Sequence, residues 1–236
     1  MKKISYTSGI SAIPLLGMTI GDKFDETAQL FPDQEALVVL HQDIRWTYQE
    51  LQQEVNTCAK ALLACGLEKG DRVGIWSPNR YEWTVIQFAT AKVGIILVNI
   101  NPAYRLHELE YALNQSGCKM LVTASQFKTS LYEEMITELA PELSQADFGE
   151  LHSAKLPHLR RVVVLADKPA QGLCAWKDFM DLAVKSSDEA LAKRQSSLAF
   201  DEPINIQYTS GTTGYPKGAT LSHHNILNNG YFVTKP

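Results

Sequence analysis

The stretch "DRVGIWSPNRYEWTVIQFATAKVGIILVNIN" (residues 71–101) shows a strand, a helix and a second strand in succession. Residues 71–77 are apolar at their centre and read as a buried strand. Residues 81–93 read as a helix, and residues 94–101 as a second apolar strand. Almost wholly apolar strands that alternate with helices are typical of a parallel sheet covered on both faces. The sequence therefore predicts an α/β fold with a largely parallel sheet flanked by helices on both faces.

The alternation extends toward the N-terminus. Residues 20–31 are expected to form a short helix opened by Asp22, with Phe24, Ala28 and Phe31 on one side.

Two short strands are expected within residues 35–48, before a longer helix. Thr47, followed three residues later by Glu50, predicts a capping box that opens a helix at residues 48–65. Gly66 is expected to end this helix, because glycine readily adopts the conformation of a C-terminal cap.

The alternation also continues toward the C-terminus. The expected elements are a helix at 106–116 ended by Gly117, a strand at 118–124, a helix at 127–140 and a strand at 160–166. Residues 141–160 and 184–202 show little pattern and are expected to be surface loops or short helices.

The composition indicates a protein that acts on a small molecule. The 236 residues are 45% hydrophobic and 20% charged, with a net charge of −4, and no run of Lys or Arg appears. This balance argues against nucleic acid as a partner. No apolar run approaches the roughly 18 residues that a membrane span needs. Residues 1–18 resemble neither a signal nor a transit peptide, so a cytoplasmic location is expected.

The cysteines and histidines predict no metal site. The four cysteines, Cys58, Cys65, Cys118 and Cys174, have no zinc-like spacing and are expected to be buried free thiols. The six histidines are scattered apart from His223 and His224.

The stretch "YTSGTTGYPKGATLS" (residues 208–222) has the composition of an anion-binding loop between two strands. A Walker A loop would place Gly where Pro216 stands and Ser or Thr where Gly218 stands, and it would run straight into a helix. Residues 218–222 instead alternate as a returning strand. A nucleotide-binding loop of another class is therefore expected, and a flexible hairpin turn with a chance Lys is the weaker alternative.

The residue types in this loop suit phosphate. Gly211, Gly214 and Gly218 are expected to take positive φ and to bring backbone N–H groups close to an anion. Hydroxyl donors come from Thr209, Ser210, Thr212 and Thr213. Lys217 adds a compact positive charge, and Pro216 stiffens the backbone beside it.

Ser222 is expected to cap a helix that begins at His223. For His223 itself two interpretations stay open: a residue at a helix start without chemistry, or a neighbour of the active site.

At residues 208–218 the sequence resembles the signature (Y/F)TSG(S/T)TGxPKG of the adenylate-forming superfamily, and residues 221–225 match its usual continuation. Upstream, residues 47–83 and 99–119 resemble further segments of that family. Together with residues 35–43 they are most similar to medium- or long-chain fatty acyl-CoA synthetases, in particular to the medium-chain acyl-CoA ligase group. The likeness covers roughly residues 20–233.

The resemblance implies a two-step reaction. A carboxylate attacks the α-phosphate of ATP to give acyl-adenylate and pyrophosphate, and coenzyme A then displaces AMP. It further implies that Lys217 and Thr209 act in catalysis and that Thr209 helps to hold Mg²⁺. The ATP-binding residues implied are Thr209, Ser210, Gly211, Thr212, Thr213, Gly214, Tyr215, Pro216, Lys217 and Gly218.

The resemblance also implies that much of such an enzyme is missing here. The family's segments for adenine and ribose, and its small C-terminal domain with a catalytic Lys, have no counterpart in this sequence. Residues 1–19 are expected to be an extension and residues 20–236 the N-terminal portion of the large AMP-binding domain, inactive alone and prone to self-association. The lack of a presequence favours a bacterial member. The alternatives are a stand-alone phosphate-binding module and, more weakly, a kinase or ATPase of another class.

The remaining aromatic and acidic residues have no expected role in chemistry. Trp76, Trp83, Tyr104 and Tyr111 are expected to pack in the core, and Glu82, Glu108 and Glu110 to lie on solvated helix faces. No general base is assigned, because a carboxylate substrate is already ionised near neutral pH.

Overall fold

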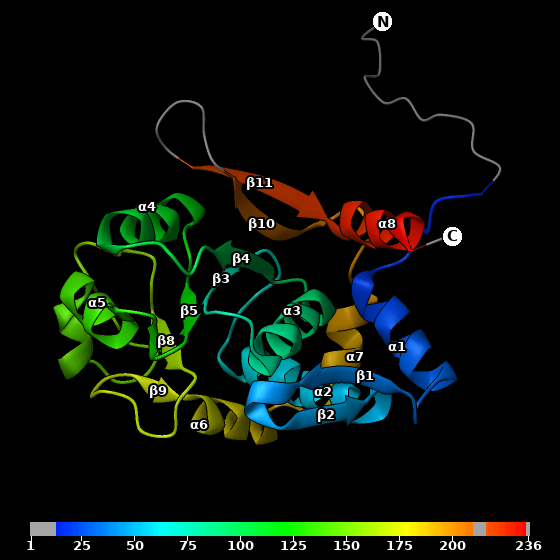
Figure 1. Cartoon of the computed structure of the whole chain (residues 1–236), viewed down its shortest axis with the longest axis horizontal. Helices are drawn as coiled ribbons and strands as arrows, with labels where there is room; N and C mark the ends of the chain where they lie inside the picture. Colours follow the sequence, from blue (N-terminus) through cyan, green and yellow to red (C-terminus); the bar gives the residue numbers. More distant parts are fainter. Residues whose placement is uncertain (1–12, 210–215, 235–236) are drawn as a thin grey trace, which may run out of the picture.

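The computed structural model describes residues 13–209 and 216–234 (Figure 1). Within those residues the main sheet has the strand order β11-β10-β4-β3-β5-β8-β9. All neighbours in it run parallel except β10 and β11, which are antiparallel. The strands are β3 (Arg72–Trp76), β4 (Ile96–Ile100), β5 (Met120–Thr123), β8 (Arg161–Val164), β9 (Cys174–Ala175), β10 (Pro203–Thr209) and β11 (Lys217–Ser222). The predicted parallel sheet is confirmed.

Helices and two small hairpins surround this sheet. The helices are α1 (Ile20–Leu30), α2 (Tyr48–Ala64), α3 (Tyr81–Val93), α4 (Leu106–Ser116), α5 (Tyr132–Leu139), α6 (Trp176–Asp181), α7 (Asp188–Ser196) and α8 (His223–Val233). The hairpins pair β1 (Glu35–Val39) with β2 (Ile44–Thr47) and β6 (Gln126–Phe127) with β7 (Ser130–Leu131). Short 3-10 helices are Leu40–Gln42, Pro141–Gln145 and Leu182–Lys185.

The alternation of side chains along β3 divides the core into two layers. Val73 and Ile75 pack in the cluster that includes residues of α2 and α3. Trp76 packs in the opposite cluster, with residues of α4 and α5, and stacks on Tyr132 at 3.5 Å between ring centroids. Successive strand residues point to opposite faces, so a strand that is apolar throughout supplies both layers.

Capping explains why the central helices begin and end where the sequence predicted. Thr47 and Glu50 form the predicted capping box at the start of α2. Gly94 and Gly117 adopt left-handed conformations directly after α3 and α4. Glycine pays no steric cost there, so the predicted bounds 81–93 and 106–116 are confirmed.

Three local predictions are wrong. The residue that caps α1 is Thr19, whose hydroxyl accepts the backbone N–H of Asp22 at 3.0 Å. Phe31, expected on the same side of that helix as Phe24 and Ala28, lies just past the helix end and is 46% exposed, whereas those two residues are buried. Residues 126–131 form the β6–β7 hairpin instead of the first turns of a helix. Lys128 has a φ of 52° in this hairpin, which a helix cannot contain.

Glu82 is also not the solvated residue that was expected. Its side chain is buried, and its two carboxylate oxygens accept hydrogen bonds from the Arg80 guanidinium at 2.9 and 3.2 Å. The Gln42 side-chain amide donates a third at 3.0 Å. Glu82 thereby links α3 to the segment after β1, whereas Glu108 and Glu110 are half-buried on α4.

The expected burial of aromatic residues and cysteines holds in part. Trp76 is fully buried, whereas Trp83 and Tyr104 lie half-buried against the core. Tyr111 lines a surface hollow. All four cysteines are free thiols, with Cys58, Cys65 and Cys118 buried and Cys174 half-buried. Among the described residues, no helix combines the length and the apolar character needed to cross a membrane.

Candidate functional site

The predicted phosphate-binding stretch joins β10 and β11, the hairpin at one edge of the sheet (Figure 1). β10 also pairs in parallel with β4, and the register of the hairpin ends with Thr209 opposite Lys217. The connection thus leaves from the carboxyl end of a parallel strand, where ligands bind in open α/β sheets. Lys217 starts a strand rather than a helix, which excludes a Walker A loop.

Part of the predicted site lies outside the described residues: Ser210, Gly211, Thr212, Thr213, Gly214 and Tyr215. Their assignments stay predictions. Thr209, Pro216, Lys217 and Gly218 are described, and they lie at the two ends of the connection.

Thr209 and Lys217 face each other across the end of the hairpin. The Thr209 hydroxyl donates to the backbone carbonyl of Lys217 at 3.4 Å. Both residues are exposed to solvent. Strand pairing therefore brings Thr209 and Lys217, eight residues apart in the chain, to the same end of the hairpin. The Thr209 hydroxyl and the Lys217 ammonium group are thus candidate partners for an anion bound there.

Gly218 has a different reason to be glycine from the one predicted. It lies within β11 and is not among the described glycines with positive φ. A Cβ atom at this position would lie 3.0 Å from Cγ2 of Ile206 and 3.6 Å from the ring of Tyr208. The prediction of positive φ at Gly218 is wrong, and what favours glycine there is the limited room for a Cβ atom across the hairpin.

Tyr208 connects this hairpin to α4. Its hydroxyl donates to the backbone carbonyl of Ala112 at 3.1 Å. Burial raises the pKa of Tyr208 to about 12, and Cys118 adds to the effect. The phenol therefore stays a hydrogen-bond donor at neutral pH. The sequence showed Tyr208 as a motif position but carried no sign of its partner on α4.

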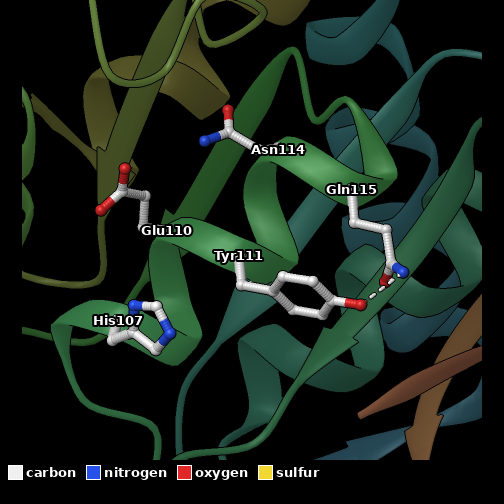
Figure 2. A pocket seen from close by; sticks show the side chains of 5 residues that line it. All are labelled: His107, Glu110, Tyr111, Asn114 and Gln115. Carbon is white, nitrogen blue, oxygen red and sulfur yellow. Dashed lines mark hydrogen bonds between the residues drawn. The ribbon is translucent and has the colours of Figure 1, made fainter. Parts of the chain in front are cut away.

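A hollow of about 440 Å³ lies along α4 near the hairpin. Figure 2 shows the side chains that line it: His107, Glu110, Tyr111, Asn114 and Gln115. They recur at helical spacing, so they share one face of α4. The Gln115 amide donates to the Tyr111 hydroxyl at 2.6 Å, and the hydroxyl of Tyr111 lies 3.5 Å from the carbonyl oxygen of Pro216. The expectation that Tyr111 packs in the core gave no sign of this contact to Pro216.

The start of α8 follows the predicted pattern. Ser222 accepts the backbone N–H of Asn225 at 3.2 Å, and the Asn225 side chain accepts the backbone N–H of Ser222 at 3.0 Å. This reciprocal cap confirms the helix start at His223.

His223 is fully buried between α8 and α1. Its Nδ1 accepts the backbone N–H of Ile20, the first residue of α1, at 3.2 Å. Burial lowers the pKa of His223 to about 4, although the carboxylates of Glu202 and Asp22 favour the protonated ring. The N-termini of both helices meet at the ring and also disfavour a positive charge. These contacts favour the structural interpretation of His223.

The assignment of Thr209 to Mg²⁺ stays a prediction. The described residues contain no group of three or more His, Cys, Asp or Glu side chains that could hold a metal ion. Thr209 offers one hydroxyl oxygen, whereas Mg²⁺ prefers six oxygen ligands, carboxylates and phosphates among them. Mg²⁺ at Thr209 would therefore need further oxygen ligands, such as the phosphate oxygens of a bound nucleotide.

The sequence matches known proteins over nearly its whole length. Residues 24–235 match the family described as "AMP-binding enzyme". The mouse protein "Medium-chain acyl-CoA ligase ACSF2, mitochondrial" is 48% identical over 231 residues, which are 98% of this chain and 37% of that protein. The "Putative acyl-CoA synthetase YngI" of Bacillus subtilis is 40% identical over 215 residues, 91% of this chain and 39% of that protein.

The fold matches solved structures as well. A long-chain-fatty-acid-CoA ligase (FadD1) from Archaeoglobus fulgidus superposes with a TM-score of 0.72 at 20% identity. The match covers 98% of this chain and 42% of the archaeal one, and at this identity it bears on the fold alone. The chain spans well under half the length of these proteins.

Proposed function

This chain belongs to the AMP-binding enzyme family, and we propose that it is the N-terminal part of an ATP-dependent acyl-CoA synthetase. The reaction would convert a fatty acid, ATP and coenzyme A into acyl-CoA, AMP and pyrophosphate through an acyl-adenylate. The observation that carries the proposal is the hairpin with Thr209 opposite Lys217, joined by the family's phosphate-binding signature. A medium- or long-chain fatty acid is the proposed substrate class, supported by the name of the mouse relative, a medium-chain acyl-CoA ligase.

In this proposal the hairpin grips the β- and γ-phosphates of ATP. The substrate carboxylate attacks the α-phosphorus, the bond to the bridging oxygen breaks, and pyrophosphate leaves with the electron pair. Lys217 would stabilise the charge that develops on pyrophosphate, together with hydroxyls and backbone N–H groups of residues 209–218. The strands fix the direction of the leaving group for in-line displacement. Thr209 would contribute one oxygen ligand to Mg²⁺, with phosphate oxygens of ATP among the others.

We further propose that these residues do not complete the reaction alone. Residues 20–236 would be the N-terminal portion of the large domain and residues 1–19 an extension, since the similar proteins are more than twice as long. A cytoplasmic location and a bacterial source are also proposals. The four free thiols suit a reducing compartment, while the relatives named include both a mitochondrial and a bacterial protein.

Self-association of the isolated chain is part of the proposal. β11 is the outer strand of the sheet, with residues 217–220 exposed, and α8 exposes Phe232 and Val233. An exposed strand edge beside apolar side chains favours pairing with a second chain. Sedimentation velocity should show a dimer that dissociates on dilution, and a monomer at all concentrations would contradict this.

Calorimetric titration with pyrophosphate tests the phosphate grip. The Lys217→Ala variant should bind roughly 10-fold to 100-fold more weakly, the effect of losing one charge-assisted hydrogen bond. Lys168→Ala, at an exposed lysine after β8, is the matched control and should bind as the unmodified chain does. Equal affinity in all three proteins would refute the role of Lys217.

Exchange of labelled pyrophosphate into ATP tests the reaction. The 236-residue chain should show no exchange with added fatty acid, whereas a protein extended by the rest of the reading frame should form acyl-CoA. Exchange by the chain alone would contradict its inactivity. Pyrophosphate binding without any activity in the extended protein would favour a stand-alone binding module.

A further inference from the structure

Two tyrosines hold the loop end of the hairpin against α4. Tyr208, on β10, donates to the carbonyl of Ala112 at 3.1 Å. Tyr111, on α4, has its hydroxyl 3.5 Å from the carbonyl oxygen of Pro216, the residue directly before β11. One contact therefore restrains the strand that enters the predicted phosphate loop, and the other restrains the backbone that leaves it.

Gln115 determines how the Tyr111 hydroxyl is used. A phenol oxygen offers one hydrogen and accepts hydrogen bonds. The Gln115 amide donates to this oxygen at 2.6 Å and so occupies its acceptor side. The hydrogen of the hydroxyl is then directed to another acceptor, and the Pro216 carbonyl is in reach. Figure 2 shows Gln115 and Tyr111 bonded on one face of α4, as expected for residues four apart on a helix.

Pro216 lies where the hairpin's own hydrogen bonds end. The register of the two strands stops at Thr209 and Lys217, so Pro216 is one residue beyond the ladder. Its fixed φ limits its motion, and its ring removes the backbone N–H that could have bonded across the hairpin. A contact to its carbonyl restrains the backbone that carries the ammonium group of Lys217.

We propose that Tyr111, oriented by Gln115, is a positioning residue that holds Pro216 and Lys217 in the geometry that binds pyrophosphate. The inference rests on the proposed function for its ligand but not for the contact itself. Binding an anion costs less when the backbone is already ordered, because less conformational entropy is lost on binding. Since 3.5 Å is long for such a bond, the expected effect is small, about threefold to fivefold in affinity.

Hydrogen–deuterium exchange of the ligand-free chain tests the contact. In Tyr111→Phe the backbone amides of residues 217–220 should exchange about threefold to fivefold faster, while those of β3 and β5 keep their rates. Gln115→Ala should give the same pattern, because it releases the hydroxyl. Asn114→Ala is the matched control: it alters the same hollow, but its amide bonds the carbonyl of Lys155 and not the hairpin.

Pyrophosphate titration of the same variants tests the consequence. Tyr111→Phe should weaken binding about threefold to fivefold at an unchanged urea midpoint, which a purely structural role would shift. Unchanged amide hydrogen exchange in Tyr111→Phe would overturn the inference. Faster amide exchange with unchanged pyrophosphate affinity would overturn it as well. If the unmodified chain binds no pyrophosphate, the proposed function fails and the positioning role fails with it. Amide hydrogen exchange of the ligand-free chain then shows, independently of any ligand, whether Tyr111 restrains the hairpin.

Discussion

Acidification should destabilise this protein through His223 before most of its carboxylates titrate. The ring is fully buried and accepts the N–H of Ile20, and its pKa falls from the ordinary 6.5 to about 4. Between pH 6.5 and about 4 the His223 ring is mostly protonated in the unfolded chain but mostly neutral in the folded chain. The folded state therefore loses stability as the pH falls from about 6.5 toward 4.

The size of the effect follows from the two pKa values. The difference between 6.5 and about 4 corresponds, at about 1.4 kcal/mol for each pH unit, to roughly 3 kcal/mol in total. Of this, about 1.8 kcal/mol should disappear from the free energy of unfolding between pH 7 and pH 5. Asp25, whose pKa is lowered because hydrogen bonds from Lys92, Gln195 and Gln52 outweigh its burial, contributes at lower pH.

Urea unfolding followed by tryptophan fluorescence at pH 7, 6 and 5 measures this loss. His223→Asn keeps an acceptor near the position of Nδ1, but its side chain does not titrate. Between pH 7 and pH 5 its free energy of unfolding should therefore fall by about 1.8 kcal/mol less than that of the unmodified protein. His224→Asn, at the partly exposed neighbour, is the control and should keep the slope of the unmodified protein. The same slope in His223→Asn and the unmodified protein would refute the reasoning.

Three other predictions follow from packing and charge. Gly218→Ala should lower the free energy of unfolding by about 1–3 kcal/mol, because its Cβ would meet Ile206 at 3.0 Å. Urea unfolding should show a smaller loss in an Ile206→Ala background. Equal losses in both backgrounds would contradict the clash. Lys92→Met should lower the free energy of unfolding by about 3 kcal/mol in the same assay, because Asp25 would lose the buried ammonium group that lies 2.6 Å away. A loss of under about 1 kcal/mol would refute this. Of the four thiols, that of Cys174 should react first with an aromatic disulfide reagent, and a fast phase that survives in Cys174→Ser would contradict this assignment.

Local signals in the sequence predicted most of the elements. Gly117 and the pair Thr47 and Glu50 set helix bounds that the structure confirms. Such signals act within one or two turns of the chain, so they can be read without knowing the fold. They were insufficient at residues 126–131, where Lys128 breaks a run that otherwise reads as helix.

Contacts between distant segments could not be predicted in this way. The sequence placed Glu82 on a helix but gave no sign that Gln42, 40 residues earlier, donates to its buried carboxylate. Tyr208 bonds Ala112 from 96 residues away, and His223 bonds Ile20 from 203 residues away. Neither hydrogen bond can be inferred from local periodicity or from capping residues.

Periodicity, helix caps and one long continuous motif were enough to predict the α/β fold, the main helix bounds and the family. The tertiary structure decided which side chains meet. It turned His223 inward toward α1, explained Gly218 by packing rather than by φ, and brought Tyr111 to the hairpin. The physical reason is that short segments encode their own backbone conformation. The partners of a side chain depend on the order in which strands and helices pack, which the whole chain sets.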